Sequence, residues 1–128
     1  MRLLLDTHTF LRWVAASGGL SRKAQSAVGS ARNECFVSVA SGWEIAIKVS
    51  LGKLRIDGAL DRFVPEQLAA NGFRALAIDL KHAARAATLP FHHRDPFDRL
   101  LVAQALEEEL AMVTAHPAVA KYGVNRVW

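Results

Sequence analysis

The sequence predicts an α/β fold with a central parallel sheet of four to five strands and helices packed on both faces. Short continuous apolar runs, such as RLLLD at 2–6 and CFVSV at 35–39, are typical of strands that are buried on both faces. These runs alternate with segments whose apolar residues recur at helical spacing. Strand, helix, strand, helix is the order found in parallel sheets, whose crossovers are right-handed.

The chain has 128 residues, of which 52% are hydrophobic, so we expect one domain over residues 1–128. Cys35 is the one cysteine, which excludes an internal disulfide and suits a reducing compartment; we therefore expect a cytoplasmic protein. No run approaches the roughly 18 apolar residues of a membrane-spanning helix, and the N-terminus does not have the pattern of a signal peptide, so no membrane partner is expected. The net charge of +4 weakly favours a polyanionic partner.

The first part of the chain is expected to contain four helices and three strands. Ser21 is placed to cap the second helix, and Gly52 and Gly72 suit the ends of the third and fourth. The expected helices are 9–17, 20–33, 41–52 and 60–72, and the expected strands are 2–6, 35–39 and 73–78.

The second part contains the most clearly marked helix, DPFDRLLVAQALEEEL. Asp95 is placed to cap this helix, and Pro96 suits its first turn. Asp79 precedes a shorter helix in the same way. The expected elements are helices at 80–87 and 95–110, a loop at 88–94, a strand at 111–115 and an edge strand at 125–128.

Three acidic residues are expected at one edge of this sheet. Parallel α/β sheets bind ligands beyond the carboxyl ends of their strands, where the strand order reverses. Asp6 ends the first strand, and Glu44 follows the second strand inside SGWEIAIK. Asp98 lies in DPFDR, at the start of a helix whose preceding loop can reach the same edge.

Each acid also has a local explanation. Asp6 can cap the helix that follows it. Glu44 has capping-box spacing to Ser41 and the i,i+4 spacing of an ion pair to Lys48.

Asp98 lies in a first helical turn, where the helix dipole favours an acid, and the adjacent Arg99 offers an ion pair. The joint placement of the three acids is more informative than any one of them. Carboxylates gathered at one edge repel each other unless a cation lies among them, and carboxylate oxygens are the ligands that Mg²⁺ and Mn²⁺ prefer. Such a site suits phosphodiester hydrolysis, in which a metal holds the phosphate and activates a water molecule.

Four motifs together resemble a known family. They are LLLDTHTFLRW, SVASGWEIAIKVSLGKL, LPFHHRDPFDRLLVAQA and VTAHPAVAKYGV, which cover nearly the whole chain. In order and spacing they resemble the PIN-domain family and, more narrowly, the VapC-type toxins of bacterial type II toxin–antitoxin systems. The resemblance implies a PIN-like fold and a metal-dependent endoribonuclease that uses Mg²⁺ or Mn²⁺.

The resemblance also implies roles for particular residues and partners. Asp6, Glu44 and Asp98 match the catalytic, metal-binding acids, and Thr7 and Thr114 match hydroxyl residues that orient acids or water. RNA is the implied substrate, and tRNA is a frequent target in this family. Proteins of this kind usually form homodimers and are neutralised by a VapB-like antitoxin, which places a basic side chain among the acids.

His116 departs from the family pattern, since the corresponding position commonly carries a fourth aspartate. Pro117 makes His116 an expected N-cap at the mouth of a strand. A neutral imidazole nitrogen can still ligate, and it favours Mn²⁺ or a later transition metal over Mg²⁺. The loss of a carboxylate keeps open an alternative: a catalytically weakened or inactive module that binds RNA or a protein partner.

The paired histidines His92 and His93 are expected to have loop or capping roles, with at most one of them touching the site. Neighbouring residues of an extended loop point to opposite sides, so the pair does not readily chelate one ion. Trp13, Trp43 and Trp128 are expected in the core or at interfaces. No recognition-helix pattern favours a DNA-binding module.

Overall fold

The protein is described by a computed structural model of all 128 residues, with a parallel five-stranded sheet at its centre. The strand order is β3-β2-β1-β4-β5, and every neighbouring pair runs parallel. The predicted α/β class and the edge strand at the C-terminus are therefore confirmed. The elements are β1 (Arg2–Leu5), α1 (Thr7–Ala15), α2 (Arg22–Gly29), β2 (Glu34–Ser38), α3 (Val39–Ser50), α4 (Leu60–Asn71), β3 (Arg74–Leu76), α5 (Leu80–Thr88), α6 (Pro96–Glu108), β4 (Ala111–Val113), the 3-10 helix η1 (Pro117–Tyr122) and β5 (Arg126–Val127).

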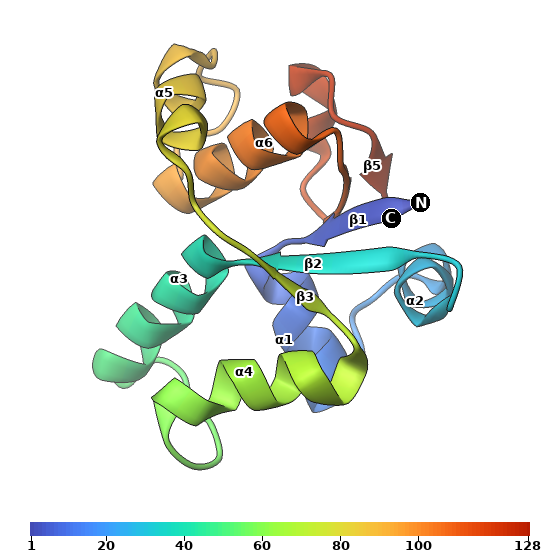
Figure 1. Cartoon of the computed structure of the whole chain (residues 1–128), viewed down its shortest axis with the longest axis vertical. Coiled ribbons are helices and arrows are strands. Elements are labelled where there is room, and N and C mark those ends of the chain that lie inside the picture. The colour runs from blue at the N-terminus through green and yellow to red at the C-terminus, as the bar shows by residue number, and fades with distance from the viewer.

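The sheet separates two apolar cores, because successive side chains of a strand point to opposite faces. Leu3 and Leu5 of β1 face the core that is covered by α1 to α4, whereas Leu4 faces the core under α5, α6 and η1. Figure 1 shows these two groups of helices on opposite sides of the strands. The three leucines have no exposed surface, which explains the continuous apolar run in the sequence.

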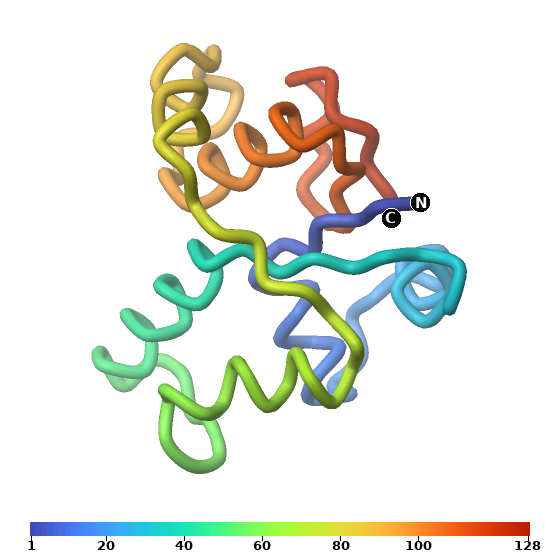
Figure 2. The backbone as a smooth tube through the Cα atoms, in the orientation of Figure 1, coloured from blue at the N-terminus to red at the C-terminus, as the bar shows by residue number.

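The chain path places the middle of the sheet at β1 and β4. From β1 the chain adds β2 and then β3 on one side, and it returns through α5 and α6 to add β4 and β5 on the other side (Figure 2). The strand order therefore reverses between β1 and β4. Their carboxyl ends, which lead into Asp6 and Thr114, lie at the point where such sheets bind ligands.

The helix boundaries follow from capping groups. The first helix begins two residues earlier than predicted, because the Asp6 side chain caps it. The third helix also begins earlier, at Val39, because the Ser38 hydroxyl accepts the backbone N–H of Ala40. Pro65 lies inside α4 and does not start a new helix. None of the helices combines the length and apolar character needed to cross a membrane.

Candidate active site

Asp6 and Thr114 join the two strands at the centre of the sheet. Asp6 is 2% exposed, and its Oδ1 accepts the backbone N–H of Thr9 at 2.8 Å. The Thr114 hydroxyl donates to Asp6 Oδ2 at 2.6 Å. A carboxylate this deeply buried needs such donors, because desolvation disfavours its charge. Asp6 is thus both a helix cap and a fixed acid at the strand-order reversal, so the two explanations of this residue are compatible.

Asp98 lies in the first turn of α6, and its backbone N–H donates to the side chain of the N-cap Asp95. Burial is the main cause that raises the pKa of Asp98 above its usual value, and the neighbouring charges of Asp95 and Asp6 raise it further. His93 and His116 act in the opposite direction. Since Asp6 is among the charges that raise the pKa of Asp98, these two acids from separate elements are close enough to repel each other. Their mutual repulsion is what a bound cation would relieve.

Glu44 forms its ion pair within its own helix. It lies in α3, and its carboxylate forms an ion pair with Lys48 at 3.3 Å, the predicted i,i+4 contact. The predicted capping box with Ser41 is wrong, because Ser38 caps the helix and Ser41 lies within it. Ser41 instead accepts a hydrogen bond from the Thr7 hydroxyl at 2.9 Å, so Thr7 links α1 to α3.

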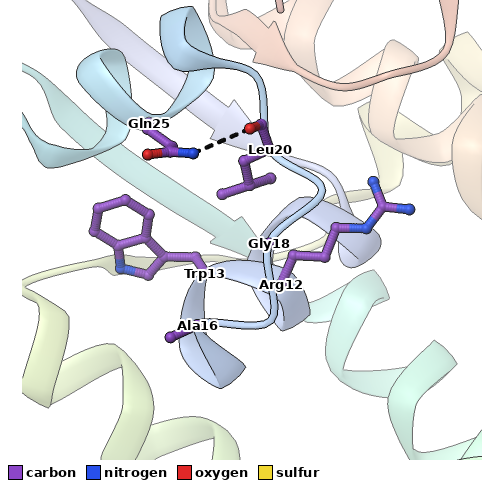
Figure 3. Close-up of a pocket in the computed structure, with 6 residues that line it drawn as sticks. All are labelled: Arg12, Trp13, Ala16, Gly18, Leu20 and Gln25. Atoms are coloured by element: carbon purple, nitrogen blue, oxygen red, sulfur yellow. Dashed lines mark hydrogen bonds between the residues drawn. The ribbon is translucent and has the colours of Figure 1, made fainter.

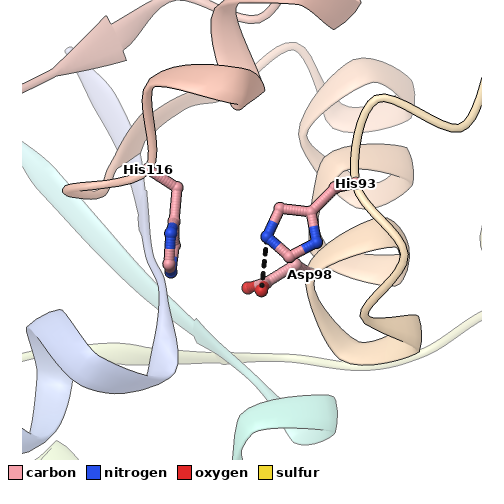
Figure 4. A group of neighbouring side chains, drawn as sticks. All are labelled: His93, Asp98 and His116. Carbon is pink, nitrogen blue, oxygen red and sulfur yellow. Dashed lines mark ion pairs between the residues drawn. The ribbon is translucent and has the colours of Figure 1, made fainter.

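His93, Asp98 and His116 come close enough to surround one ion. Each offers a ligand atom, and these atoms lie within 4.8 Å of one another. Figure 4 shows Asp98 beside His93, with His116 reaching toward them from the segment before η1. The shortest of these contacts joins His93 Nε2 and Asp98 Oδ2 at 3.2 Å. Asp6 and Glu44 belong to no group of this compactness.

His92 points to a different neighbour. Its ring packs edge-on against Tyr122, 4.9 Å between centroids, while His93 packs against His116 at 5.4 Å. Only one histidine of the pair therefore touches the candidate site, as predicted. No pattern in the sequence indicates which of the two histidines it is.

Arg99 holds the loop that carries His93. The predicted ion pair between Arg99 and Asp98 is wrong, because the guanidinium is turned away toward backbone carbonyls and packs on the Phe91 ring at 4.2 Å. A buried guanidinium has five donors, and carbonyl groups of a tight loop satisfy them well. The four accepting carbonyls belong to Ala86, Leu89, Pro90 and His93.

A polar pocket of about 130 Å³ opens beside Asp6 and His116. His8, Thr9 and Arg12 complete most of its wall. Arg12 is the one side chain in this wall with a permanent positive charge, so it is suited to meet an anionic ligand that approaches Asp6.

A larger hollow of about 400 Å³ lies at the other end of α1 (Figure 3). Trp13, Leu20 and Gln25 surround it, and the Gln25 amide donates to the Leu20 carbonyl at 3.1 Å. No acidic side chain lines this hollow, so it does not fit a cation.

A second group of histidine and acids lies between α5 and α6. His82 has no exposed surface and lies 3.0 Å from Glu108 Oε1, with Asp79 close by. Hydrogen bonds from His82 and then Lys81 hold the pKa of Glu108 below its usual value. The group joins two helices through a satisfied hydrogen-bond network, which is a structural role.

The comparisons with known proteins agree with this architecture. The PIN domain family model matches residues 3–124. Ribonuclease VapC16 of Mycobacterium tuberculosis is 36% identical over 62 residues, which are 48% of this chain and 44% of that protein, so the chain matches less than half the length of this relative.

Two solved structures share the fold. The crystal structure of VapBC2 from Rickettsia felis, bound to a promoter DNA fragment, contains a chain with a TM-score of 0.73 and 14% identity, and the match covers 98% of this chain and 97% of that one. The structure of FitAcB from Neisseria gonorrhoeae has a TM-score of 0.59 at 19% identity, covering 97% and 95% of the two chains. Because the PIN domain family model matches residues 3–124, the chain belongs to the PIN domain family, as its motifs predicted.

Proposed function

We propose that the protein is a metal-dependent endoribonuclease of the VapC type. The observation that carries the proposal is the position of Asp6, held by Thr9 and Thr114 at the strand-order reversal, where its charge reaches Asp98. The PIN domain match and the name of the relative Ribonuclease VapC16 support a nuclease. The net charge of the chain, +4, suits a polyanionic substrate.

The donor set fits a hard divalent cation, Mg²⁺ or Mn²⁺. Asp6 and Asp98 supply carboxylate oxygens, Glu44 supplies a third from α3, and His116 has ring nitrogens free of protein hydrogen bonds. Burial is the main cause of the raised pKa of Asp98, and the charges of Asp95 and Asp6 add to it; a bound cation would offset this repulsion. When bound, such an ion activates a water molecule and stabilises charge on the phosphate.

The chain's own residues would position these partners. Thr114 and the Thr9 N–H hold Asp6 in one orientation, so little reorganisation is needed on binding. Arg12, in the wall of the pocket beside Asp6, would contact an RNA phosphate. An RNA substrate, with tRNA as the first candidate, implies action in the cytoplasm.

The test is cleavage of RNA by the purified protein with Mg²⁺ or Mn²⁺. We expect Asp6→Asn to abolish cleavage, because it removes a ligand carboxylate, and EDTA to stop it, because it removes the metal ion. Cleavage that survives both treatments would contradict the proposal. A matched control is Asp57→Asn, since Asp57 lies in the pocket formed by α1 and α4 and not at the carboxyl edge.

An inactive RNA- or partner-binding module remains the second candidate, and His116 is the observation that favours it. His116 brings no negative charge to a site that commonly has a fourth acid. The same RNA assay separates the two: binding of RNA without cleavage, in the presence of Mn²⁺, would favour the module.

We also propose a VapB-like antitoxin as a protein partner, together with a homodimer. The supporting observation is an apolar groove of about 450 Å³ between α3 and α4, beside which Trp43 is 62% exposed. Exposed apolar surface of this kind is typical of protein interfaces. Co-purification with the small antitoxin and light scattering of the free toxin test both statements. Trp43→Ser should weaken antitoxin binding while RNA cleavage persists.

A further inference from the structure

His93 is the residue of the site whose role the family motifs do not assign, and its backbone is held on both sides. Its N–H donates to the Tyr122 hydroxyl at 2.8 Å, and its carbonyl accepts Arg99 Nη1 at 3.4 Å. The half-buried ring therefore has a defined place next to Asp98.

The hydrogen bonds of the ring identify its tautomer. The backbone N–H of Asp95 donates to His93 Nδ1 at 3.1 Å. A backbone N–H can only donate, so Nδ1 carries a lone pair and the ring hydrogen of the neutral imidazole lies on Nε2. Nε2 is 3.2 Å from Asp98 Oδ2, and it therefore donates to this carboxylate.

The same arrangement occurs a second time in the chain, away from the candidate site. The backbone N–H of Asp79 donates to His82 Nδ1 at 2.9 Å, and His82 Nε2 faces Glu108 at 3.0 Å. In both cases a backbone N–H at a helix N-cap selects the tautomer that gives its hydrogen to an acid. His82 thus provides an internal reference for His93.

This tautomer argues against His93 as a metal ligand. His93, Asp98 and His116 form a group of suitable size, but ligation through Nε2 requires a lone pair there. The ring hydrogen would then move to Nδ1 and face the Asp95 N–H, which would lose its acceptor. A partly buried N–H that loses its acceptor disfavours this mode of ligation.

We propose that His93 is a positioning residue, which donates from Nε2 to Oδ2 of Asp98 and so orients this carboxylate for the cation. This inference rests on the proposed function, since it assigns Asp98 to the metal site. With Oδ2 occupied by His93, Oδ1 is the oxygen left for the ion. Hydrogen bonds to ligating groups typically change metal affinity by 10–100-fold.

Two substitutions separate the two hydrogen bonds of His93. The amide nitrogen of His93→Gln occupies about the place of Nε2 and keeps the donor to Asp98. The amide oxygen of His93→Asn lies near Nδ1 and keeps the acceptor for Asp95. We expect His93→Asn to weaken Mn²⁺ binding about tenfold by calorimetry and His93→Gln to stay within about threefold of the wild type. His92→Asn, on the neighbouring residue that packs against Tyr122, is the control and should bind as the wild type does.

Nuclear magnetic resonance tests the tautomer directly in the wild-type protein. At about pH 8, where histidines are mostly neutral, two-bond ¹H–¹⁵N correlations should show His93 and His82 as Nε2–H tautomers. His93 should keep this pattern when Zn²⁺, the probe for ligation by imidazole, is added. A shift to the Nδ1–H pattern on Zn²⁺ addition would overturn the proposal, because it would make His93 a ligand.

Equal Mn²⁺ affinity of His93→Asn and the wild type would also overturn it. These readouts need no RNA, so they distinguish the two proposals. If the wild-type protein does not cleave RNA but His93→Asn weakens Mn²⁺ binding, the proposed ribonuclease is contradicted and the role of His93 is supported. If the wild-type protein cleaves RNA but His93→Asn binds Mn²⁺ as the wild type does, the ribonuclease is supported and the role of His93 is contradicted.

Discussion

The Thr114 hydroxyl donates to Asp6 Oδ2 at 2.6 Å, and this contact ties together residues that are 108 positions apart in the chain. Asp6 follows β1 and Thr114 follows β4, the two strands between which the strand order reverses. The side chain of Asp6 also caps α1 through Thr9. One carboxylate therefore fixes the start of a helix, joins two strands and presents a charge at the candidate active site.

Thr114→Val should weaken metal binding, because it removes a donor from Asp6 while keeping the shape of the side chain. We expect roughly a tenfold loss of Mn²⁺ affinity in calorimetry. The free energy of unfolding in urea should fall by about 1–2 kcal/mol, since a buried carboxylate loses a hydrogen bond. Thr114→Ser keeps the hydroxyl and should retain the affinity. Equal affinity in the valine variant would show that Asp6 is oriented by Thr9 alone.

His116→Asp should raise the affinity for Mg²⁺ over that of the wild type. The added carboxylate brings a negative charge next to Asp98, and we expect roughly a tenfold gain, about 1.4 kcal/mol. Calorimetric titration with Mg²⁺ measures it. His8→Asp is a useful comparison, because the exposed His8 ring lines the same pocket, with its centroid 6.3 Å from that of His116. If His116→Asp and the wild type bind Mg²⁺ equally, position 116 does not sense the ion.

Glu44→Gln and Lys48→Met should differ in their effects. Both break the 3.3 Å ion pair, which by itself contributes only about 0–1 kcal/mol to stability. Only Glu44→Gln removes a proposed metal ligand, so we expect it to reduce RNA cleavage while Lys48→Met retains it. Parallel losses in the two variants would mean that the ion pair, and not the carboxylate, is what the site requires.

Arg99→Lys should loosen the loop that carries His93. A single ammonium cannot replace a guanidinium that donates to four backbone carbonyls. We expect a loss of about 2–3 kcal/mol in the free energy of unfolding and faster hydrogen exchange in residues 89–94. Exchange rates that match those of the wild type would show that Tyr122 is sufficient to hold the loop.

Glu108 should make stability depend on acid pH. Hydrogen bonds from His82 and Lys81 lower the pKa of Glu108 in the folded protein, so its contribution is complete above the pKa of the unfolded chain. The contribution is lost as the pH falls through the lower pKa of the folded state. Glu108→Ala should therefore destabilise the protein at neutral pH, by about 1–3 kcal/mol because His82 loses its acceptor. The difference from the wild type should shrink at acid pH; a constant difference in urea denaturation would contradict this linkage.

The order of the helices and strands could be predicted from local patterns, but their exact limits could not. The buried strand of Leu3 to Leu5 is visible as an apolar run because both of its faces meet a core. By contrast, the start of α3 depends on whether Ser38 or Ser41 caps it, and both have the right chemistry. Tertiary contacts decide the choice. Ser41 accepts a hydrogen bond from Thr7, and Ser38, at the end of β2, also donates one to Gln104 of α6.

The sequence by itself determined the fold class, because apolar periodicity is a local property. It also predicted the three acids as a site, since a parallel sheet brings the carboxyl ends of its strands to one edge. Only the tertiary structure decided how those acids are held. Three-dimensional packing decides that His93 and not His92 meets Asp98 and that Arg99 turns away from Asp98. It also brings Thr114 to Asp6, 108 positions away in the chain. Such contacts depend on the directions in which side chains point in the folded protein, and the spacing of residues along the chain does not reveal these directions.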